Sequence, residues 1–296
     1  MIWIMLIAGR RVAGIGLGTA PFAFGGGTFA DSVATVHAAL DAGVRLVDTA
    51  LAYTRADAES YAEQVIATAL RDVASGDRPL IATEGGHRRQ GDCFPVDGRP
   101  AVLRAHCEIS LRTLGLETIG LYYLHHVDPA VPLSDSVGAL GQLRDEGKIT
   151  AIGLSNVTIA QLDRALTAAP VSAVQNRLSY ADPRDRPMAL ACAERGLAYL
   201  ARSTLARPSQ APALRAALAV AGRHGASVQR VLLAWLLAQV PGAVPLVGAG
   251  RPASIRDSAV PLGLTARDLA DLSDAGRPAG GLLLRSLIEK PPRAGG

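Results

Sequence analysis

The feature of this chain that most constrains its fold is a repeated alternation between short apolar runs and longer segments of helical period. The short runs are rich in β-branched residues and leucine, which predicts strands, and the segments between them predict helices. This alternation continues from end to end, as repeated strand–helix units do. Eight strands are predicted, over residues 15–19, 44–49, 80–83, 118–125, 150–155, 171–176, 197–203 and 243–248.

The segments between the predicted strands carry helix start and stop signals. Asp31, Ser134 and Thr158 are residue types that cap helix N-termini, and Gly43 and Gly147 suit the ends of the first two of these helices. Eight strand–helix units in roughly 250 residues favour a closed α/β barrel, the (β/α)8 or TIM barrel, over an open sheet. No linker divides the chain, so we expect a single barrel domain over 1–296, with its core at about 12–275.

The two ends of the chain fall outside the strand–helix repeat. The opening M-I-W-I-M-L-I-A-G is apolar, but it has no basic region and is too short to span a bilayer. We predict that it forms a strand of an N-terminal hairpin that turns at Gly9 and Arg10. The tail at 276–296 is rich in Gly and Pro, with one apolar patch, which suggests either a flap over the barrel mouth or a frayed end.

Charge and cysteine content exclude several classes of partner. The chain has 30 Lys and Arg against 26 Asp and Glu, and the basic residues are scattered, so a nucleic-acid partner is not expected. The three cysteines are far apart, which favours a reducing cytoplasm over a disulfide framework. His, Cys and carboxylate residues show no zinc-like spacing. We therefore expect a cytoplasmic protein with no metal, membrane or nucleic-acid partner and leave its oligomeric state open.

Polar side chains gather where the predicted strands end, and in a barrel of parallel strands these ends form the rim that carries chemistry. The adjacent His125 and His126 should point to opposite faces of their strand, so we expect only one of them in the site. It is His125 if Tyr123, which shares its face, lines the barrel, but alternation alone does not fix which face is inward. The strand-end residues are Asp48, Tyr53, Glu84, His125, Ser155, Asn156, Gln175, Asn176 and Ser203.

Two glycine-rich segments predict different things. G-I-G-L-G at 14–18 lacks the spacing and the following helix of a Rossmann fingerprint. V-P-L-V-G-A-G-R-P at 244–252 instead runs from a strand through Gly248, Ala249 and Gly250 to Arg251 and a proline suited to a first helical turn. A tight turn with a surface arginine would look the same, but this is the eighth strand, where barrels commonly bind phosphate.

Six motifs occur in order over about residues 12 to 275, and the set resembles the aldo-keto reductase superfamily. They are G-L-G-T-A, D-A-G-V-R-L-V-D-T-A-L-A-Y, L-H-H-V-D-P, E-G-K-I-T-A-I-G-L-S-N, V-Q-N-R and V-G-A-G-R-P. The resemblance implies a (β/α)8 barrel that binds NADP(H) extended across its rim, and a small-molecule carbonyl compound as substrate.

The resemblance also implies site residues. Tyr53 corresponds to the general acid, Asp48 to its supporting carboxylate and His125 to an imidazole that orients the substrate carbonyl. The implied cofactor contacts run from the nicotinamide to the adenosine end. They are Gly18, Thr19, Asp48, Ser155, Asn156, Gln175, Ser203, Leu205, Gly248, Ala249, Arg251, near the 2′-phosphate, and Asp257 and Ser258, near the adenine.

This sequence departs from the family pattern at two positions. Leu178 stands where an aromatic residue usually stacks on the nicotinamide, with Tyr180 as a candidate replacement. Glu84 stands where the catalytic lysine is expected, and the two lysines of the chain, Lys148 and Lys290, are elsewhere.

The exchange of a lysine for Glu84 reverses a charge beside Tyr53. An ammonium group lowers the pKa of a neighbouring tyrosine, whereas a carboxylate raises it. At about 4 Å and an effective dielectric constant near 20, one pair of unit charges is worth roughly 4 kcal/mol. Asp48 and Glu84 would also share one pocket, so one of them should hold its proton, and a protonated Glu84 could act as an acid itself.

Three functions agree with this sequence. The first is an NADPH-dependent reductase with an altered catalytic tetrad of Tyr53, Asp48, Glu84 and His125. The second is acid–base chemistry without net hydride transfer, such as a dehydration, isomerisation or cyclisation. The third is a binding or regulatory protein, against which the presence of both Tyr53 and His125 argues. A catalytically impaired form whose lysine was replaced at position 84 would have the same sequence.

Overall fold

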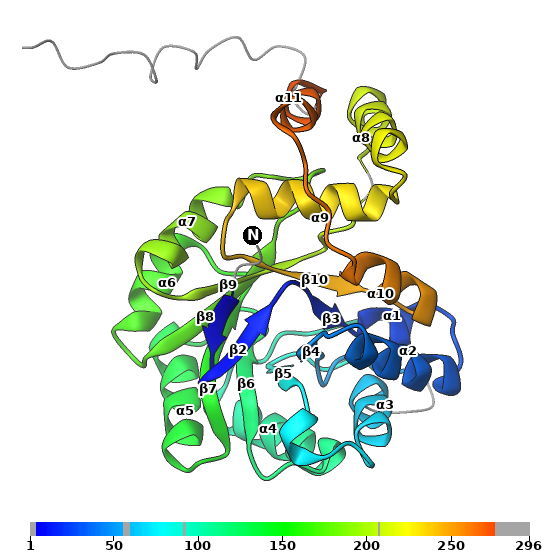
Figure 1. Cartoon of the computed structure of the whole chain (residues 1–296). Helices are drawn as coiled ribbons and strands as arrows, with labels where there is room; N and C mark the ends of the chain where they lie inside the picture. The colour runs from blue at the N-terminus through cyan, green and yellow to red at the C-terminus, as the bar shows by residue number, and fades with distance from the viewer. Residues whose placement is uncertain (1–3, 56–59, 91–92, 207, 276–296) are drawn as a thin grey trace, which may run out of the picture.

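Eight parallel strands form a closed barrel, as the alternation in the sequence predicts (Figure 1). The computed structural model describes residues 4–55, 60–90, 93–206 and 208–275. Around the barrel the strands follow the order β10-β3-β4-β5-β6-β7-β8-β9. Their bounds are β3 (Gly16–Gly18), β4 (Leu46–Asp48), β5 (Leu80–Gly85), β6 (Ile119–Leu124), β7 (Ile149–Ser155), β8 (Val171–Arg177), β9 (Ala198–Arg202) and β10 (Val244–Gly248).

Helices surround the barrel and connect its strands (Figure 1). The last two lie after β10, and a single 3-10 turn, η1 (Ser75–Asp77), precedes β5. The helices are α1 (Ala20–Phe24), α2 (Phe29–Asp41), α3 (Tyr61–Ala69), α4 (Pro100–Leu114), α5 (Leu133–Asp145), α6 (Ile159–Leu166), α7 (Arg186–Glu194), α8 (Ala211–His224), α9 (Val228–Gln239), α10 (Pro252–Ala259) and α11 (Ala266–Ala275).

One of the three predicted N-caps is confirmed. Thr158 caps α6 and forms a capping box with Gln161. The prediction for Asp31 was wrong, because Thr28 is the N-cap of α2 and Asp31 is the third helical residue of the same capping box. The prediction for Ser134 was also wrong, since α5 begins at Leu133 and Ser134 lies in its first turn.

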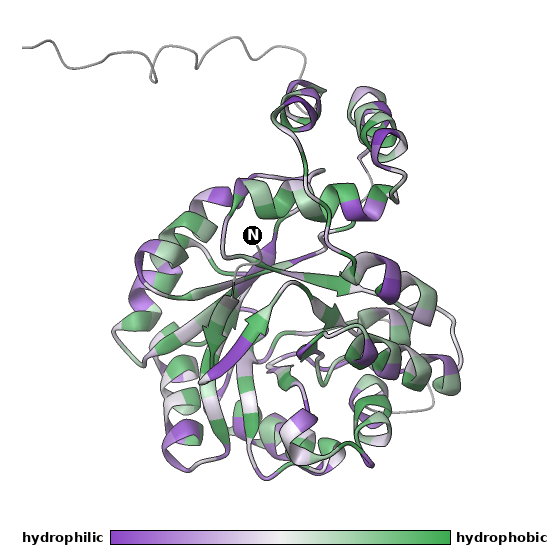
Figure 2. Ribbon diagram, in the orientation of Figure 1, coloured by the Kyte–Doolittle hydropathy of each residue, from purple (hydrophilic) through white to green (hydrophobic). Residues whose placement is uncertain are grey.

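An antiparallel hairpin of β1 (Ile4–Ile7) and β2 (Arg10–Ala13) covers the N-terminal mouth of the barrel (Figure 1). Its turn is formed by Ala8 and Gly9, which both have positive φ, so the predicted turn was one residue late: Arg10 already pairs with Ile7. Ile7 and Val12 are buried together with residues of the barrel interior. In Figure 2, β2 is accordingly hydrophilic where it begins and hydrophobic further along.

The hydrophobic core consists of the barrel interior and the layer between strands and helices. Interior side chains such as Leu46, Leu121 and Leu246 pack with the hairpin. Two outer clusters bury the opposite faces of the strands against the helices, one around α4 to α9 and one around α2 and α3. Both faces of each strand are therefore apolar, as in parallel sheets covered by helices. Polar residues remain at the strand ends.

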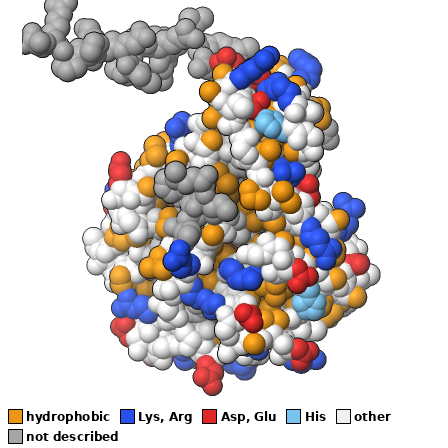
Figure 3. Space-filling view, in the orientation of Figure 1, with side chains coloured by type: hydrophobic (Ala, Val, Ile, Leu, Met, Phe, Trp, Pro, Cys, Tyr) orange, Lys and Arg blue, Asp and Glu red, His pale blue; other side chains and the backbone are white. Residues whose placement is uncertain are grey.

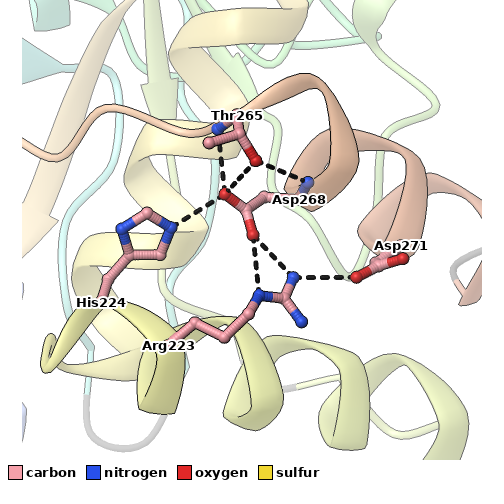
Figure 4. A network of polar contacts seen from close by, with 5 residues as sticks. All are labelled: Arg223, His224, Thr265, Asp268 and Asp271. Carbon is pink, nitrogen blue, oxygen red and sulfur yellow. Dashed lines mark hydrogen bonds and ion pairs between the residues drawn. The ribbon is translucent and has the colours of Figure 1, made fainter.

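Helices α8 and α11 lie side by side, and Figure 4 shows the polar network that joins them. The carboxylate of Asp268 accepts hydrogen bonds from the hydroxyl and backbone N–H of Thr265 at 2.7 and 2.9 Å. Arg223 of α8 donates to the same carboxylate and to Asp271, and His224 contacts it at 2.8 Å. A buried carboxylate with these partners fixes the start of α11 against α8.

The face that carries the hairpin has basic and acidic side chains interspersed among apolar ones (Figure 3). In the part of the chain that the structure describes, no helix is both long enough and apolar enough to cross a membrane. The predicted tail at 276–296 lies outside the described residues.

Candidate functional site

Because the barrel is closed and its strands are parallel, the predicted strand-end residues lie together along one rim. Asp48 ends β4, Glu84 lies one residue before the end of β5, and Ser155 ends β7. The register sets these positions level, because Ser155 pairs with Gln175 of β8 and Glu84 with Tyr123 of β6. The carboxyl ends of the strands therefore present their polar side chains at one end of the barrel.

Glu84 and His125 form the closest pair in this site. One carboxylate oxygen of Glu84 lies 2.7 Å from Nε2 of His125. The side chain of Glu84 is 1% exposed and that of His125 is 16% exposed. The backbone N–H of His125 donates to the carbonyl of Gly85 at 2.9 Å and so holds the two residues side by side. This contact places an imidazole nitrogen directly against a buried carboxyl group.

Asp48 is held by both its backbone and its side chain. Its carbonyl accepts from the N–H and the hydroxyl of Thr19, each at 3.0 Å, and its carboxylate accepts from Nε2 of Gln175 at 2.9 Å. Burial and the nearby charge of Glu84 raise the pKa of Asp48 well above its usual range, whereas Gln175 and Arg202 oppose this shift. Two carboxyl groups in one low-dielectric pocket disfavour double ionisation.

Tyr53 lies on the loop after β4, beside the same carboxyl groups. Its ring packs edge to face against His125, with ring centres 6.4 Å apart, and against Phe24, at 5.8 Å. Burial, Glu84 and Asp48, in that order, raise the pKa of the phenol well above its ordinary value, and Arg202 lowers it. The direction agrees with the charge reversal expected from a carboxylate in place of a lysine.

His126 also faces this site, so the expectation that it lies on the opposite face from His125 was wrong. β6 ends at Leu124, so both imidazoles lie beyond the strand and its alternation no longer applies. Their rings are stacked with centres 5.4 Å apart, and the ring of His87 lies 4.7 Å from each. Burial is the main cause that lowers the pKa of His87 to about 4 and the pKa of His126 below its ordinary value.

Arg202 is a residue of the site that the sequence interpretation missed. It ends β9, and its guanidinium donates a short hydrogen bond to Oδ1 of Asn156. The side-chain amide of Asn156 in turn donates to the carbonyl of His125 at 2.9 Å and lies 3.0 Å from Nε2 of His126. The available signal was a charged residue that ends the apolar run L-A-Y-L-A-R.

Asn156 and Ser203 depart from regular strand geometry at the rim. Both have positive φ, of 58° and 56°, which few residues other than glycine adopt. Next to Ser203, the hydroxyl of Thr204 donates to the carbonyl of Leu246, and Leu205 is half-buried. Backbone strain of this kind occurs where a ligand or a sharp turn requires it.

The segment after β10 lies further along the same rim. Gly248 is exposed, Ala249 is buried, and Arg251 is the exposed N-cap of α10, a helix start that no side chain caps. Asp257 accepts a hydrogen bond of 2.5 Å from Ser227, the N-cap of α9. Its carboxylate therefore joins two helices in this structure.

Tyr180 is not an aromatic replacement for the residue missing at Leu178. Its ring packs against Trp235, with centres 5.0 Å apart, and its hydroxyl donates to the carbonyl of Leu272 at 2.9 Å. Both Tyr180 and Leu178 belong to the outer core between strands and helices. That candidate role was wrong.

Among the residues that the structure describes, no three or more His, Cys, Asp or Glu side chains form a group that could hold a metal ion. Cys93 is exposed, Cys107 and Cys192 are buried, and all three are free thiols.

The chain is similar to proteins of a known family. The model of the aldo/keto reductase family matches residues 14–275. An uncharacterized oxidoreductase of Schizosaccharomyces pombe is 28% identical over 250 residues, which cover 83% of this chain and 79% of that protein. An aldo-keto reductase of Bacillus subtilis is 32% identical over 170 residues, or 56% of this chain and 50% of that protein.

Solved structures resemble this fold over nearly its whole length. A glycerol dehydrogenase from Gluconobacter oxydans has a TM-score of 0.79 at 25% identity and covers 96% of this chain and 98% of its own. An aldo/keto reductase from Klebsiella pneumoniae in complex with NADP and acetate has a TM-score of 0.77 at 25% identity, with coverage of 94% and 97%.

These matches indicate an enzyme of the oxidoreductase type. Proteins of the matching family use nicotinamide cofactors and act on small-molecule carbonyl compounds. On the match over residues 14–275, this chain belongs to the aldo/keto reductase family.

Proposed function

We propose that this protein is an NADP(H)-dependent reductase of small aldehydes or ketones, with Tyr53 as proton donor and Glu84 in the position of the usual lysine. The observation that carries the proposal is that the side chains of Tyr53, Asp48, Glu84 and His125 lie near one another at the barrel rim. The pKa of Tyr53 responds to both carboxyl groups, and the ring of Tyr53 packs on that of His125.

The rim residues fit a dinucleotide, whose phosphate groups are negatively charged. The start of α10 has no side-chain cap, and a helix N-terminus attracts phosphate. The exposed Arg251 at this start favours the extra phosphate of NADP(H) over NAD(H). We assign the cofactor to Gly18, Thr19, Asp48, Ser155, Asn156, Gln175, Ser203, Leu205, Gly248, Ala249, Arg251 and Asp257. When bound, the reduced nicotinamide supplies a hydride to the carbonyl carbon.

The side chains of the cleft supply and position the proton. The raised pKa of Tyr53 keeps the phenol protonated at neutral pH, so the donor is present, but its phenolate is disfavoured beside Glu84. His125, 2.7 Å from Glu84, can orient a carbonyl oxygen toward the phenol. An imidazole and a carboxyl group are groups of the kind that can also return a proton to Tyr53 after transfer.

An aromatic rim beside Tyr53 suggests the substrate class. Phe24 and Phe94 are 52% and 38% exposed, and their rings lie edge to face with centres 5.9 Å apart. Phe24 also packs against Tyr53, so the exposed rings lead directly to the proposed proton donor. Exposed aromatic side chains next to a site favour a ligand with an apolar or aromatic body. We therefore place aromatic aldehydes first among candidate substrates.

The test is oxidation of NADPH by the purified protein with a panel of aromatic and aliphatic aldehydes, followed by the absorbance of the reduced nicotinamide. We expect turnover by the native protein and a loss of at least about 100-fold for Tyr53→Phe. Binding of NADPH, followed by tryptophan fluorescence, should survive that substitution. Binding without any oxidation of NADPH across the panel would count against the proposal.

The contact between Glu84 and His125 also favours a second candidate function, in which the cleft transfers protons without a hydride. A carboxyl group and an imidazole in direct contact are a suitable acid–base pair for a dehydration or isomerisation. This function predicts that a bound substrate changes while the total amount of NADPH stays constant.

A further inference from the structure

Arg202 is a cation at the rim whose guanidinium forms no ion pair with the residues that the structure describes. Its side chain is half-buried, and one guanidinium nitrogen donates to the neutral amide of Asn156. Its buried Nε has no hydrogen-bond partner in the described ranges. No carboxylate of those ranges forms an ion pair with it. A guanidinium left in this state at a strand end is available to negative charge in the cleft.

The cleft holds an excess of groups that such a cation would stabilise. Asp48 and Glu84 are both buried, and Tyr53 becomes negative if it gives up its proton. The other arginines near Tyr53 are engaged elsewhere. Arg55 donates to the carbonyls of Phe22 and Gly27, and Arg89 donates to the carbonyl of Thr54.

The usual source of positive charge is absent from this position. Lys148 lies before β7, at the opposite end of the barrel, and pairs with Glu108 at 2.6 Å and Glu146 at 3.5 Å. Lys290 lies outside the described residues.

We propose that Arg202 supplies the positive charge that position 84 does not, and that it acts as a positioning residue for Tyr53 and Asp48. This inference rests on the proposed reductase function. In the proton-transfer step the O–H bond of Tyr53 breaks, the proton goes to the substrate oxygen, and the electron pair stays on the phenolate. Arg202 stabilises the negative charge of this phenolate and of the carboxyl groups beside it.

The charge of Arg202 affects titratable groups on several elements around it. The charge of Arg202 lowers the pKa of Asp48 on β4 and of Tyr53 on the following loop. It also lowers the pKa of His126 after β6 and of Asp185 and Tyr199 on the far side of β9. His126 has its ring nitrogen 3.0 Å from the amide of Asn156, which itself contacts Arg202, so its imidazole is a local probe of that charge.

The experiment compares Arg202→Gln, which removes the charge, with Arg202→Lys, which keeps it. We expect NADPH-dependent reduction to fall about 100-fold in the first and to stay within about tenfold in the second. In protein without cofactor, NMR titration of the His126 imidazole should move to higher pH in Arg202→Gln only. Arg195→Gln is the control for the loss of an arginine elsewhere, because Arg195 is an exposed, ion-paired arginine at the C-cap of α7, away from the rim.

A second variant, with a positive charge at position 84, distinguishes an electrostatic role of Arg202 from a structural one. The double variant R202Q/E84K should recover reduction lost in Arg202→Gln, since it returns a cation to the same cleft. The inference is overturned if Arg202→Lys loses as much activity as Arg202→Gln, or if the His126 titration does not move. If the native protein reduces no carbonyl compound, the proposed function fails, while the NMR titration still decides whether the charge of Arg202 acts in the cleft.

Discussion

The side-chain amide of Gln175 donates a hydrogen bond of 2.9 Å to the carboxylate of Asp48 and joins β8 to β4 across 127 positions of sequence. Both residues are buried, so this bond crosses the interior of the rim. It fixes one carboxyl group of the cleft, while the contact with His125 fixes the other, Glu84. The two carboxyl groups thus have different partners and can hold different protonation states.

Gln175→Leu should weaken both the fold and the reaction. It removes the hydrogen bond that lowers the pKa of Asp48 and leaves a buried carboxyl group with one partner fewer. We expect a loss of about 1–3 kcal/mol in the free energy of unfolding and about tenfold in kcat. Chemical denaturation and NADPH oxidation measure these effects. Gln142→Leu, at an exposed position of α5, should change stability by no more than about 0.5 kcal/mol.

Glu84→Lys should increase the reduction of model aldehydes. An ammonium in place of the carboxylate lowers the pKa of Tyr53 and makes the phenol a stronger acid. We expect kcat to rise by about tenfold or more, measured at saturating NADPH. The same exchange at the exposed Glu117 should leave kcat unchanged. Loss of activity in Glu84→Lys would mean instead that the carboxyl group itself takes part in the native reaction.

Phe94→Ala should impair aromatic substrates selectively. The exposed ring of Phe94 lies in the wall that includes Phe24 and leads to Tyr53. Removing one aromatic contact costs about 0.5–1.5 kcal/mol, so KM for benzaldehyde should rise about three- to tenfold. KM for a small aliphatic aldehyde serves as the internal control and should stay within about twofold. Equal changes for both substrates would exclude an aromatic wall.

Glu63→Gln should change how stability depends on pH. Glu63 is buried between α3 and β5, accepts a hydrogen bond of 2.7 Å from Thr83, and has its pKa raised to about 7 by burial. Because the folded pKa exceeds the unfolded one, the native protein loses stability as pH rises from about 4.5 to about 7, by about 3 kcal/mol. Glutamine carries no charge and should abolish this loss. Denaturation at pH 5 and pH 8 measures it, and an unchanged pH dependence would contradict the assignment.

Asp268→Asn should loosen α11 from α8. Hydrogen bonds from Thr265, then Arg223 and His224, hold the pKa of Asp268 well below its usual range. A depressed pKa means that this contribution is present above the unfolded pKa, near 4, and is lost as pH falls below it. We expect about 1.5–3 kcal/mol of destabilisation at pH 7 by thermal unfolding. Asp271→Asn, which removes only one exposed contact with Arg223, should have a smaller effect.

The strand ends of the site were predictable because a parallel barrel brings the same end of every strand to one rim. Asp48, Glu84, Ser155 and Gln175 are all found there, although they come from four different strands. His126 was assigned to the wrong side because the predicted strand continued to His125. The strand in fact ends at Leu124, and one residue at a strand end decides whether alternation applies.

Local sequence patterns could not predict residues whose role depends on contacts with distant parts of the chain. Nothing local to L-A-Y-L-A-R indicates that Arg202 meets Asn156, 46 residues away. Tyr180 likewise has its partners on α9 and α11, at Trp235 and Leu272. The cap of α2 was misread for a local reason: Thr28 and Asp31 are both capping residue types, and only the backbone shows which one precedes the helix.

The N-terminal hairpin has a consequence for how this enzyme can diversify. Ile7 and Val12 pack into one mouth of the barrel and close it. A small molecule therefore reaches the site from the opposite end, which carries the loops. The residues that pack against the hairpin are therefore different from those that would contact a substrate. If the proposed aromatic wall meets the substrate, exchange of the loop that carries Phe94 should alter specificity and leave the hairpin contacts of Ile7 and Val12 in place.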